Sequence, residues 1–261
     1  MTGAVNDAPV RAEGLTKTFW EASRGRIDAV ADVTFACRAG EIFGLLGANG
    51  AGKTTTLRML ATILAPTAGD AWIHGRSVLH EPQEVRRHLG FYSASTALYP
   101  RLTAAETLEL FARINGMPEA RVRARRDQLI ARFGIGKYAD ARIEKLSTGM
   151  KQKVSIARTI AHDPPVLIFD EPTVGLDVLN AIELQKVIAE LRDEGKTIVF
   201  STHIMSEAER LCDRIAIIHQ GRIHASDTLE ALRARTGLHY LEDIFVRIVG
   251  EADAAVGAVA T

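Results

Sequence analysis

The chain has 261 residues, of which 47% are hydrophobic and 25% charged, values that suit one globular domain, with or without an inserted subdomain. Basic and acidic side chains both number 32, so composition excludes a strong global field toward nucleic acid or an anionic membrane surface. Cys37 and Cys212 lie far apart without a CxxC spacing, which indicates reduced thiols rather than a disulfide.

The N-terminal segment has no basic stretch followed by an apolar one, so it does not resemble a secretion signal. No apolar run approaches the roughly 20 residues that span a bilayer, and any membrane role is therefore expected to come through a separate partner chain. Small residues are frequent at both ends, so we expect residues 1–9 and 251–261 to be flexible.

Apolar and β-branched segments between turn signals predict strands, and amphipathic segments predict helices. In chain order, strands are expected at 10–19, 27–37, 41–46 and 71–74, with a helix over 53–64 that Pro66 ends. A helical pattern then covers 103–133. After it come strands at 166–169, 197–201 and 214–219, and helices at 151–161, 181–191 and 205–211. Because Val166–Phe169 is an unbroken apolar run, typical of a central parallel strand, the pattern predicts an α/β core with a helical insertion.

The strongest chemical signal is a phosphate-binding pattern, G-x-x-x-x-G-K-[ST], between an apolar strand and a helix. Its residues are Gly47, Ala48, Asn49, Gly50, Ala51, Gly52, Lys53 and Thr54. Glycines let backbone N–H groups converge on phosphate oxygens, and the helix N-terminus adds positive potential. Lys53 supplies a charge for the β- and γ-phosphates, and the Thr54 hydroxyl is placed to ligate Mg²⁺. By itself the loop predicts binding of ATP or GTP and no particular purpose.

Two carboxylates, Asp170 and Glu171, directly follow the buried strand at 166–169. Ligands of open parallel sheets collect at the carboxyl ends of the strands, so both acids are expected to face the nucleotide. Asp170 suits a Mg²⁺ ligand, and Glu171 suits a general base that polarises the attacking water. The alternative is a solvated acidic turn or a helix cap, which the phosphate loop upstream makes less favourable.

Three further motifs resemble those of the ATP-binding cassette (ABC) ATPases. They are Leu146-Ser147-Thr148-Gly149-Met150, close to the LSGGQ signature, Val174-Gly175-Leu176-Asp177, similar to the D-loop, and Ser201-Thr202-His203, similar to the switch-histidine motif. The resemblance covers about Val10 to Gly250. It implies an α/β P-loop NTPase core of mostly parallel sheet with helices and an N-terminal antiparallel β subdomain. The implied bounds are about 10–90 and 163–235 for the core, 95–162 for a helical signature subdomain and 238–250 for a C-terminal helix.

The resemblance also implies how the nucleotide is held. Thr55 joins the phosphate loop, and Phe19 matches the aromatic that stacks on adenine, with neighbouring Trp20 as its rival. In the family, two ATPase domains close head to tail, so that each ATP lies between one phosphate loop and the signature of the other copy. The resemblance implies that Ser147, Thr148 and Gly149 contact the γ-phosphate and that Asp177 crosses the dimer interface. It implies that His203 bonds the γ-phosphate and holds the attacking water with Glu171.

Two departures from the family pattern concern hydrolysis. Met150 stands where the signature usually has glutamine and cannot donate its side-chain hydrogen bond. Ala94 stands where the Q-loop has glutamine, and a methyl group cannot ligate Mg²⁺. Either Ser93 or Ser95 substitutes, or Thr54, Asp170 and solvent complete the Mg²⁺ shell. We therefore expect slower or more partner-dependent hydrolysis than in a glutamine-bearing relative.

Within the family, the chain resembles stand-alone ATPase subunits of exporters, which pair with a separate permease. The segments that carry this are 99–103, 201–209 and 240–245. Residues 93–96 and 146–155 resemble the sodium-extruding (Nat-type) ATPases, so Na⁺ is the expected cargo, with a drug, peptide or antibiotic as the alternative. This role implies a peripheral protein at the cytoplasmic face of the cell membrane.

Two surfaces are candidates for the contact with the permease. A groove near residues 94–102 is the better candidate, because the family's partner docks beside the Q-loop. The arginine cluster (Arg121, Arg123, Arg125, Arg126 and Arg132) fits a solvated helix face, balanced by Glu119 and Asp127, better than a lipid contact. A soluble cassette acting on ribosomes or DNA is a less favoured alternative, because there is one cassette, no sustained heptads and no net charge, and no nucleic acid is expected as partner.

Overall fold

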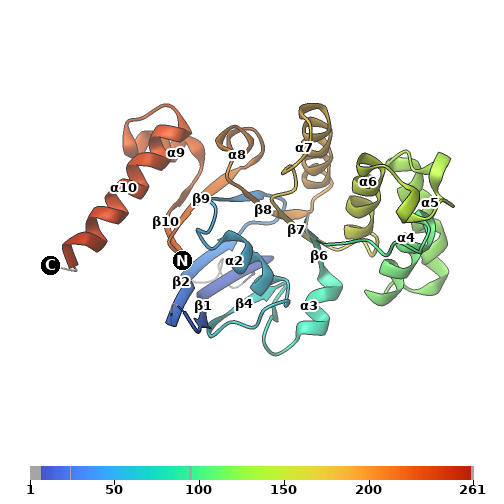
Figure 1. Ribbon diagram of the computed structural model, residues 1–261, viewed down its shortest axis with the longest axis horizontal. Coiled ribbons are helices and arrows are strands. Elements are labelled where there is room, and N and C mark those ends of the chain that lie inside the picture. Colours follow the sequence, from blue (N-terminus) through green and yellow to red (C-terminus); the bar gives the residue numbers. More distant parts are fainter. Residues whose placement is uncertain (1–6, 24, 94–95, 260–261) are drawn as a thin grey trace.

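The computed structural model describes residues 7–23, 25–93 and 96–259, the last four by backbone alone. Its ten described strands form two sheets (Figure 1). The smaller sheet is antiparallel, in the order β2-β1-β4-β5. Its strands are β1 (Val10–Glu21), β2 (Gly25–Cys37), β4 (Ala68–Ile73) and β5 (Arg76–Ser77).

The larger sheet has the order β10-β9-β3-β8-β7-β6, and all its neighbours are parallel except the pair of β10 with β9. Its strands are β3 (Ile42–Leu46), β6 (Leu89–Ser93), β7 (Val166–Asp170), β8 (Thr197–Thr202), β9 (Arg214–His219) and β10 (Arg222–Asp227). Every residue of β3, β7 and β8 is buried, as near-continuous apolar runs require in a parallel sheet covered on both faces.

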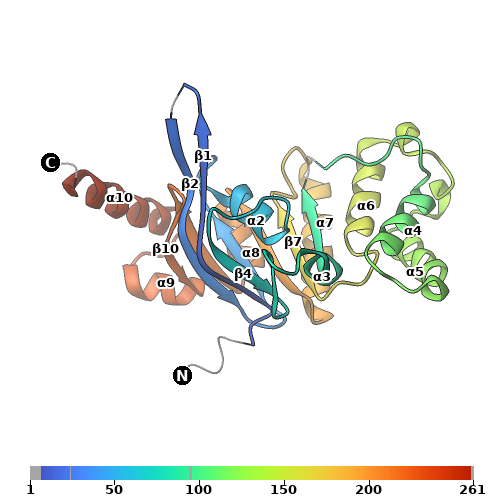
Figure 2. The same ribbon diagram turned by 90° about the horizontal axis from the view of Figure 1, so that it is seen from below.

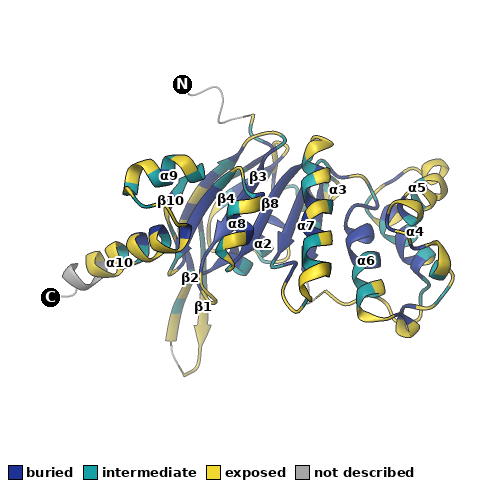
Figure 3. Ribbon diagram, turned by 90° about the horizontal axis from the view of Figure 1, so that it is seen from above, coloured by how far each residue is buried: buried dark blue, intermediate teal, exposed yellow. Residues whose placement is uncertain are grey.

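Helices cover the larger sheet on both faces. Helix α2 (Lys53–Leu60) contacts strands of both sheets, and Leu57 and Met59 bury its apolar side there (Figures 1 and 2). The remaining helices of the core are α3 (Pro82–His88), α7 (Val178–Asp193), α8 (Met205–Leu211), α9 (Leu229–Thr236) and α10 (Leu241–Val259). In Figure 3 the strands are almost wholly buried, whereas α7 and α10 each show one buried and one exposed side.

A helical subdomain lies beside the β6 edge of the sheet (Figure 1). It consists of α4 (Ala104–Ile114), α5 (Glu119–Arg132), α6 (Thr148–Thr159) and the 3₁₀ turns η1 (Gly136–Tyr138) and η2 (Ile143–Lys145). Thr103 and Glu106 form a reciprocal capping box that fixes the start of α4. The predicted α/β fold, with its antiparallel sheet and inserted helices, is confirmed.

Three expectations about helix bounds were wrong. Helix α2 ends at Leu60, because Thr62 adopts φ 58° and the N–H groups of Ile63 and Leu64 turn back to the Arg58 carbonyl. The expected C-terminal helix at 238–250 is α10, which begins at Leu241 and continues to Val259, so residues 251–259 are helical rather than a flexible tail. Four of these nine residues are alanines, the best helix former, which outweighs the expectation from small size alone.

The arginine cluster is less solvated than expected. Arg125 donates from Nη2 to the carbonyl of Ile160, 2.9 Å away, and lies near Asp163. Arg126 pairs with both Asp127 and Glu109. Burial lowers the pKa of Arg125, opposed by the carboxylate of Asp163. Part of the cluster therefore ties α5 to neighbouring segments of the chain.

Candidate functional site

The phosphate loop connects β3 to α2 in a backbone shape that only glycine fits at two points. A Cβ on Gly47 would lie 2.5 Å from the carbonyl oxygen of Ile218, and one on Gly52 would lie 2.6 Å from that of Ala29. Gly52 also has φ 105°, where L side chains are strained. Ala48, Asn49 and Gly50 at the crest of the loop are exposed. The loop is therefore held from below and open above, where phosphate oxygens would meet its N–H groups.

Lys53 is 4% exposed and points back into the loop. Its Nζ donates to the carbonyl oxygens of Gly47 at 2.7 Å and Ala48 at 3.0 Å. The same ammonium lies 3.0 Å from Oε1 of Glu171. The two groups predicted as phosphate clamp and general base thus neutralise each other in this structure.

Asp170 ends β7 and is 5% exposed. Its Oδ1 accepts hydrogen bonds from the hydroxyls of Thr54, at 3.0 Å, and Ser201, at 2.9 Å. Burial raises the pKa of Asp170, opposed by those two hydrogen bonds. Neighbouring ligands of an octahedral Mg²⁺ lie about 3 Å apart, so the oxygens of Thr54 and Asp170 have the chemistry and the spacing of such a pair.

Glu171 lies one residue beyond β7, at φ 46°, an uncommon backbone conformation for this residue type. Its N–H donates to Ser201 Oγ at 3.0 Å, which fixes the turn to β8. Nδ1 of His203 lies 3.3 Å from Oε1 of Glu171 and donates to it. Burial acts to raise the pKa of Glu171, but Lys53 and His203 outweigh it, and the pKa is lowered overall.

A buried carboxylate anchors the segment that carries His203. Glu207 on α8 is 5% exposed and accepts the hydroxyl of Thr202 at 2.6 Å. The same hydroxyl oxygen accepts the N–H of Ile204 at 2.9 Å. Gln185 of α7 donates to the other oxygen of Glu207 at 3.3 Å. His203 therefore sits between two anchored residues.

Phe19 stands near the end of the β1–β2 hairpin, which projects from the molecule in Figure 2. It pairs with Ile27, two residues from Ala29, the β2 residue whose carbonyl packs against Gly52. The Phe19 ring is 37% exposed and that of Trp20 is 79% exposed. Both aromatic residues lie on β1, which pairs with the strand that contacts the loop, and Lys17 Nζ lies 5.3 Å from the ring centre of Phe19.

The signature residues lie elsewhere. Ser147 is the N-cap of α6, where its Oγ accepts the N–H of Met150 at 3.3 Å. Within the part of the chain that the structure describes, no hydrogen bond or ion pair joins Ser147, Thr148 or Gly149 to the phosphate loop. Figures 1 and 2 both show α6 well separated from α2. Asp177 is likewise exposed and caps α7 by accepting the N–H of Asn180 at 3.0 Å.

Ala94, at the position of the expected Q-loop glutamine, and Ser95 lie outside the described residues. Ser93 is described, and is buried at the end of β6 in register with Asp170 on β7. Of the two serines considered as substitutes, Ser93 thus ends the strand beside the predicted Mg²⁺ ligand.

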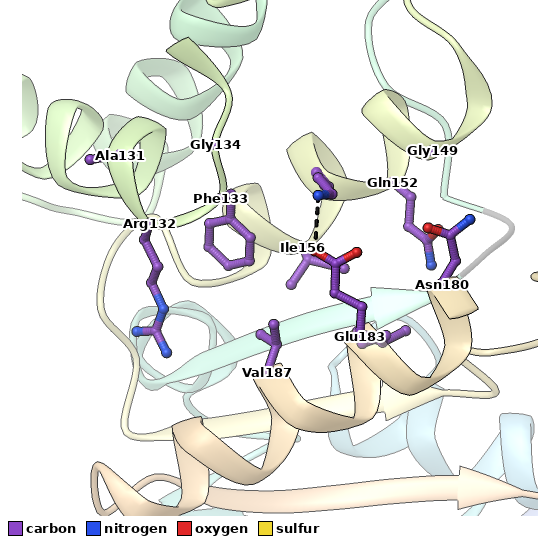
Figure 4. A pocket seen from close by; sticks show the side chains of 12 residues that line it. Ala131, Arg132, Phe133, Gly134, Gly149, Gln152, Ile156, Asn180, Glu183 and Val187 are labelled. Atoms are coloured by element: carbon purple, nitrogen blue, oxygen red, sulfur yellow. Dashed lines mark hydrogen bonds and ion pairs between the residues drawn. The ribbon is translucent and has the colours of Figure 1, made fainter. Parts of the chain in front are cut away.

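Two cavities flank α6, and neither includes the phosphate loop. One of about 450 Å³ lies between segment 96–100, α6 and the segment from Pro172 to Leu176. The other, of about 330 Å³, lies between the helical subdomain and α7 (Figure 4). Lys153 and Glu183, which both line this second cavity, form an ion pair at 2.9 Å. The second cavity thus lies between α6 and α7, the two helices that this ion pair connects.

Three contributions to the site were not predicted. Ser201 links Asp170 to the backbone of Glu171, Glu207 anchors Thr202, and Lys53 pairs with Glu171. Ser201 could have been found, since it precedes His203 at the end of a predicted strand. Glu207 gives no such signal, because an acid in the first turn of a helix is ordinarily a solvated cap.

The fold and the phosphate loop define a P-loop nucleotide-binding protein, and comparison with known proteins defines the family. Residues 30–174, more than half of the chain, match the family described as ABC transporter. The chain therefore belongs to the ABC transporter family, as an ATPase domain that binds and hydrolyses ATP. This confirms the resemblance drawn from the signature, D-loop and switch-histidine motifs.

Individual relatives support the same conclusion. The ABC transporter ATP-binding protein NatA of Bacillus subtilis is 42% identical over 79% of this chain and 84% of its own length. The daunorubicin/doxorubicin resistance ATP-binding protein DrrA of Streptomyces peucetius is 37% identical over 91% of this chain and 71% of its own.

Solved structures also match. One described as the ATP-binding subunit of an ABC transporter superposes with a TM-score of 0.82 at 33% identity, covering 92% of this chain and 99% of that one. The dimeric cassette MJ0796 bound to ADP and Pi superposes with a TM-score of 0.75 at 28% identity, covering 84% and 98%. The second shows that such cassettes form dimers.

Proposed function

We propose that two copies of this chain close head to tail around ATP and Mg²⁺, and that the hydrolysis drives export through a separate permease. The observation that carries the proposal is the contact of Glu171 with both Lys53 and His203 beside the phosphate loop. It supplies a clamp, a base and a histidine, and lacks only a group to cover the γ-phosphate from above. The signature of a second copy has the right chemistry, since Ser147 starts a helix whose N-terminus favours anions.

Nucleotide binding changes the charge balance of the site. A triphosphate competes for Lys53 with the carbonyls of Gly47 and Ala48 and with Glu171. When Lys53 turns to the phosphates, Glu171 loses its nearest cation and its basicity rises. The base is thus activated by the substrate that it acts on, with His203 as its remaining partner.

Mg²⁺ is proposed to bind between Thr54 and Asp170, whose oxygens fit it in chemistry and spacing. It would neutralise the charge of the β- and γ-phosphates. Ser201 orients Asp170 from the other side. The roles of Thr55 and of Phe19, as the adenine-stacking ring, stay predictions, with Trp20 as the alternative to Phe19.

The dimer is supported by an exposed apolar patch around the start of α7. Val178 and Leu179 are 74% and 79% exposed, and Val174 is 45% exposed, next to Asp177. Such side chains on adjacent turns are typical of an interaction surface. The related cassette MJ0796 forms a dimer, which supports the pairing of two copies.

The membrane partner and the cargo rest on the relatives alone. Because the relatives are ATP-binding proteins of transporters, the transport path is proposed to lie in a separate permease, with this chain peripheral at its cytoplasmic face. No helix among the described residues is long and apolar enough to cross a membrane. Na⁺ is the favoured cargo because residues 93–96 and 146–155 resemble the sodium-extruding (Nat-type) ATPases. A drug is the alternative because of the similarity to the daunorubicin/doxorubicin resistance protein DrrA. Sodium flux into vesicles holding the permease, with and without ATP, distinguishes the two.

The catalytic assignment is tested with Glu171→Gln, which keeps the shape of the side chain and removes its basicity. We expect steady-state hydrolysis to fall at least about 100-fold, the usual size of a general-base contribution, with ATP binding retained. Glu230→Gln, an exposed acid on α9, is the control and should keep wild-type turnover. Wild-type turnover in the Glu171 variant would overturn the assignment.

A further inference from the structure

We propose that Asp253, on the C-terminal helix α10, is a positioning residue for nucleotide binding that acts through the turn between β9 and β10. Asp253 is remote from the reacting groups, and the motifs of the nucleotide site do not include it. The proposal goes beyond the proposed function and is independent of permease and cargo, because its readout is nucleotide binding by the chain itself.

The β9–β10 turn is wedged between the phosphate loop and β2. The N–H of Gly221 donates to the carbonyl of Ala51, within the loop, at 3.0 Å. The carbonyl of Gly221 accepts the N–H of Ala31 on β2 at 2.8 Å. A Cβ placed on Gly52, the next residue of the loop, would lie 3.2 Å from the Cα of Gly221. A shift of this turn therefore moves the floor of the phosphate loop.

Helix α10 holds the same turn through one carboxylate oxygen. Oδ1 of Asp253 accepts Nε2–H of His219 at 2.9 Å and Nε2–H of Gln220 at 3.0 Å. These are the two residues before Gly221. Gln220 has φ 47°, a conformation that a residue with a side chain adopts only when its surroundings hold it. The carboxylate thus stabilises the turn on the side away from the loop.

The helix itself is fixed independently of Asp253. Leu241, Ile244 and Ile248 bury one side of α10 in the cluster that includes Ile217 and Ala225 on β9 and β10. Figures 1 and 3 show α10 packed at this edge of the sheet and extending past it. Asp253 therefore projects from an anchored helix, and the contact chain runs from α10 through Gln220 and Gly221 to Ala51.

The test measures binding of a fluorescent ATP analogue and steady-state ATPase kinetics of the full chain. Asp253→Ala should raise the Kd and the KM for ATP about threefold, the size expected from losing one or two exposed hydrogen bonds, with kcat and Tm near wild type. Asp253→Asn keeps the acceptor oxygen and should restore most of the affinity. Gln220→Ala should weaken binding similarly, and combining it with Asp253→Ala should add little, because both changes break one contact chain.

Glu251→Ala is the matched control. It removes a carboxylate two residues earlier on the same helix, one that pairs with Arg247 at 3.0 Å and not with the turn. It should leave Kd and KM unchanged. The proposal is overturned if Asp253→Ala binds ATP as tightly as Glu251→Ala does. It is equally overturned if the loss of affinity disappears once variants are compared at equal distance below their Tm.

Discussion

Lys53 and Glu171 show which features of the site could be predicted from single residues and which could not. Their proposed roles come from local motifs, a lysine after G-x-x-x-x-G and an acid that follows a buried strand in a chain with a phosphate loop. Their ion pair could not be predicted, because 117 residues of intervening fold decide that the two side chains meet. The same holds for Glu207, whose burial depends on Thr202 and Gln185 from other elements.

His162 gives a prediction about pH and stability. It is partly buried, its Nε2 donates to the Leu89 carbonyl at 3.2 Å, and its Nδ1 has no partner among the described residues. Burial lowers the pKa of His162 to about 4, with Arg125 and Lys196 acting in the same sense and Asp163 against them. The folded state thus favours the neutral ring, whereas the unfolded state takes up a proton below about pH 6.5.

The free energy of unfolding should therefore fall by about 2–3 kcal/mol on account of His162 as pH drops from about 6.5 to 4. Above pH 6.5 the neutral ring is favoured in both states, so His162 should cause no further change in stability there. In His162→Gln, which can still donate to Leu89, that part of the slope should vanish. His80→Gln, at an exposed histidine, is the control. Urea unfolding at several pH values measures it. Parallel slopes for wild type and His162→Gln would contradict the prediction.

At the scale of elements, the sequence predicted β3, β7, β8 and β9 well because short apolar runs bounded by turn signals favour buried strands. It missed β5, α3, β6, β10 and α9. Strand β10 is an edge strand with only one fully buried residue, Ala225, so its sequence carries no clear period. The end of α10 was missed because a run of small residues is compatible with both a flexible tail and a helix.

Two ion pairs connect the helical subdomain to α7 and its C-cap. Lys153 pairs with Glu183 at 2.9 Å, and Arg132 pairs with Glu194 at 2.8 Å. Exposed pairs contribute little, typically below about 1 kcal/mol. The two ion pairs therefore contribute little to holding the two parts together, and the main contact is the buried cluster in which Ile156 of α6 packs with Leu184 and Ile188 of α7.

A double-mutant cycle of Lys153→Met and Glu183→Gln should give a coupling energy of about 0.5 kcal/mol in thermal unfolding at low salt, and almost none at 1 M salt. Lys145→Met, at an exposed lysine of η2 that forms no ion pair with Glu183 among the described residues, serves as control and should show no coupling to Glu183→Gln. A coupling above about 2 kcal/mol, or one that persists at high salt, would show that the pair fixes the subdomain.

At the scale of the whole molecule, the proposed dimer explains why the signature lies away from the phosphate loop. The chain's phosphate loop, base and histidine are gathered on one sheet, whereas Ser147 and Asp177 are exposed at helix starts away from them. The sequence indicated this separation only through the family resemblance, because no pattern within one chain reveals that a site is completed by a second copy. The exposed Val178 and Leu179 are the structural sign of it.

The most direct measurement is the mass of the Glu171→Gln protein in solution with and without ATP and Mg²⁺, by light scattering after gel filtration. We expect the 28.4 kDa chain alone without nucleotide and twice that mass with ATP. Adding Ser147→Arg, which places a bulky side chain at the signature, should keep the protein monomeric with ATP still bound. A Glu171→Gln protein that binds ATP and stays monomeric at all concentrations, or a dimer indifferent to Ser147→Arg, would contradict the composite site.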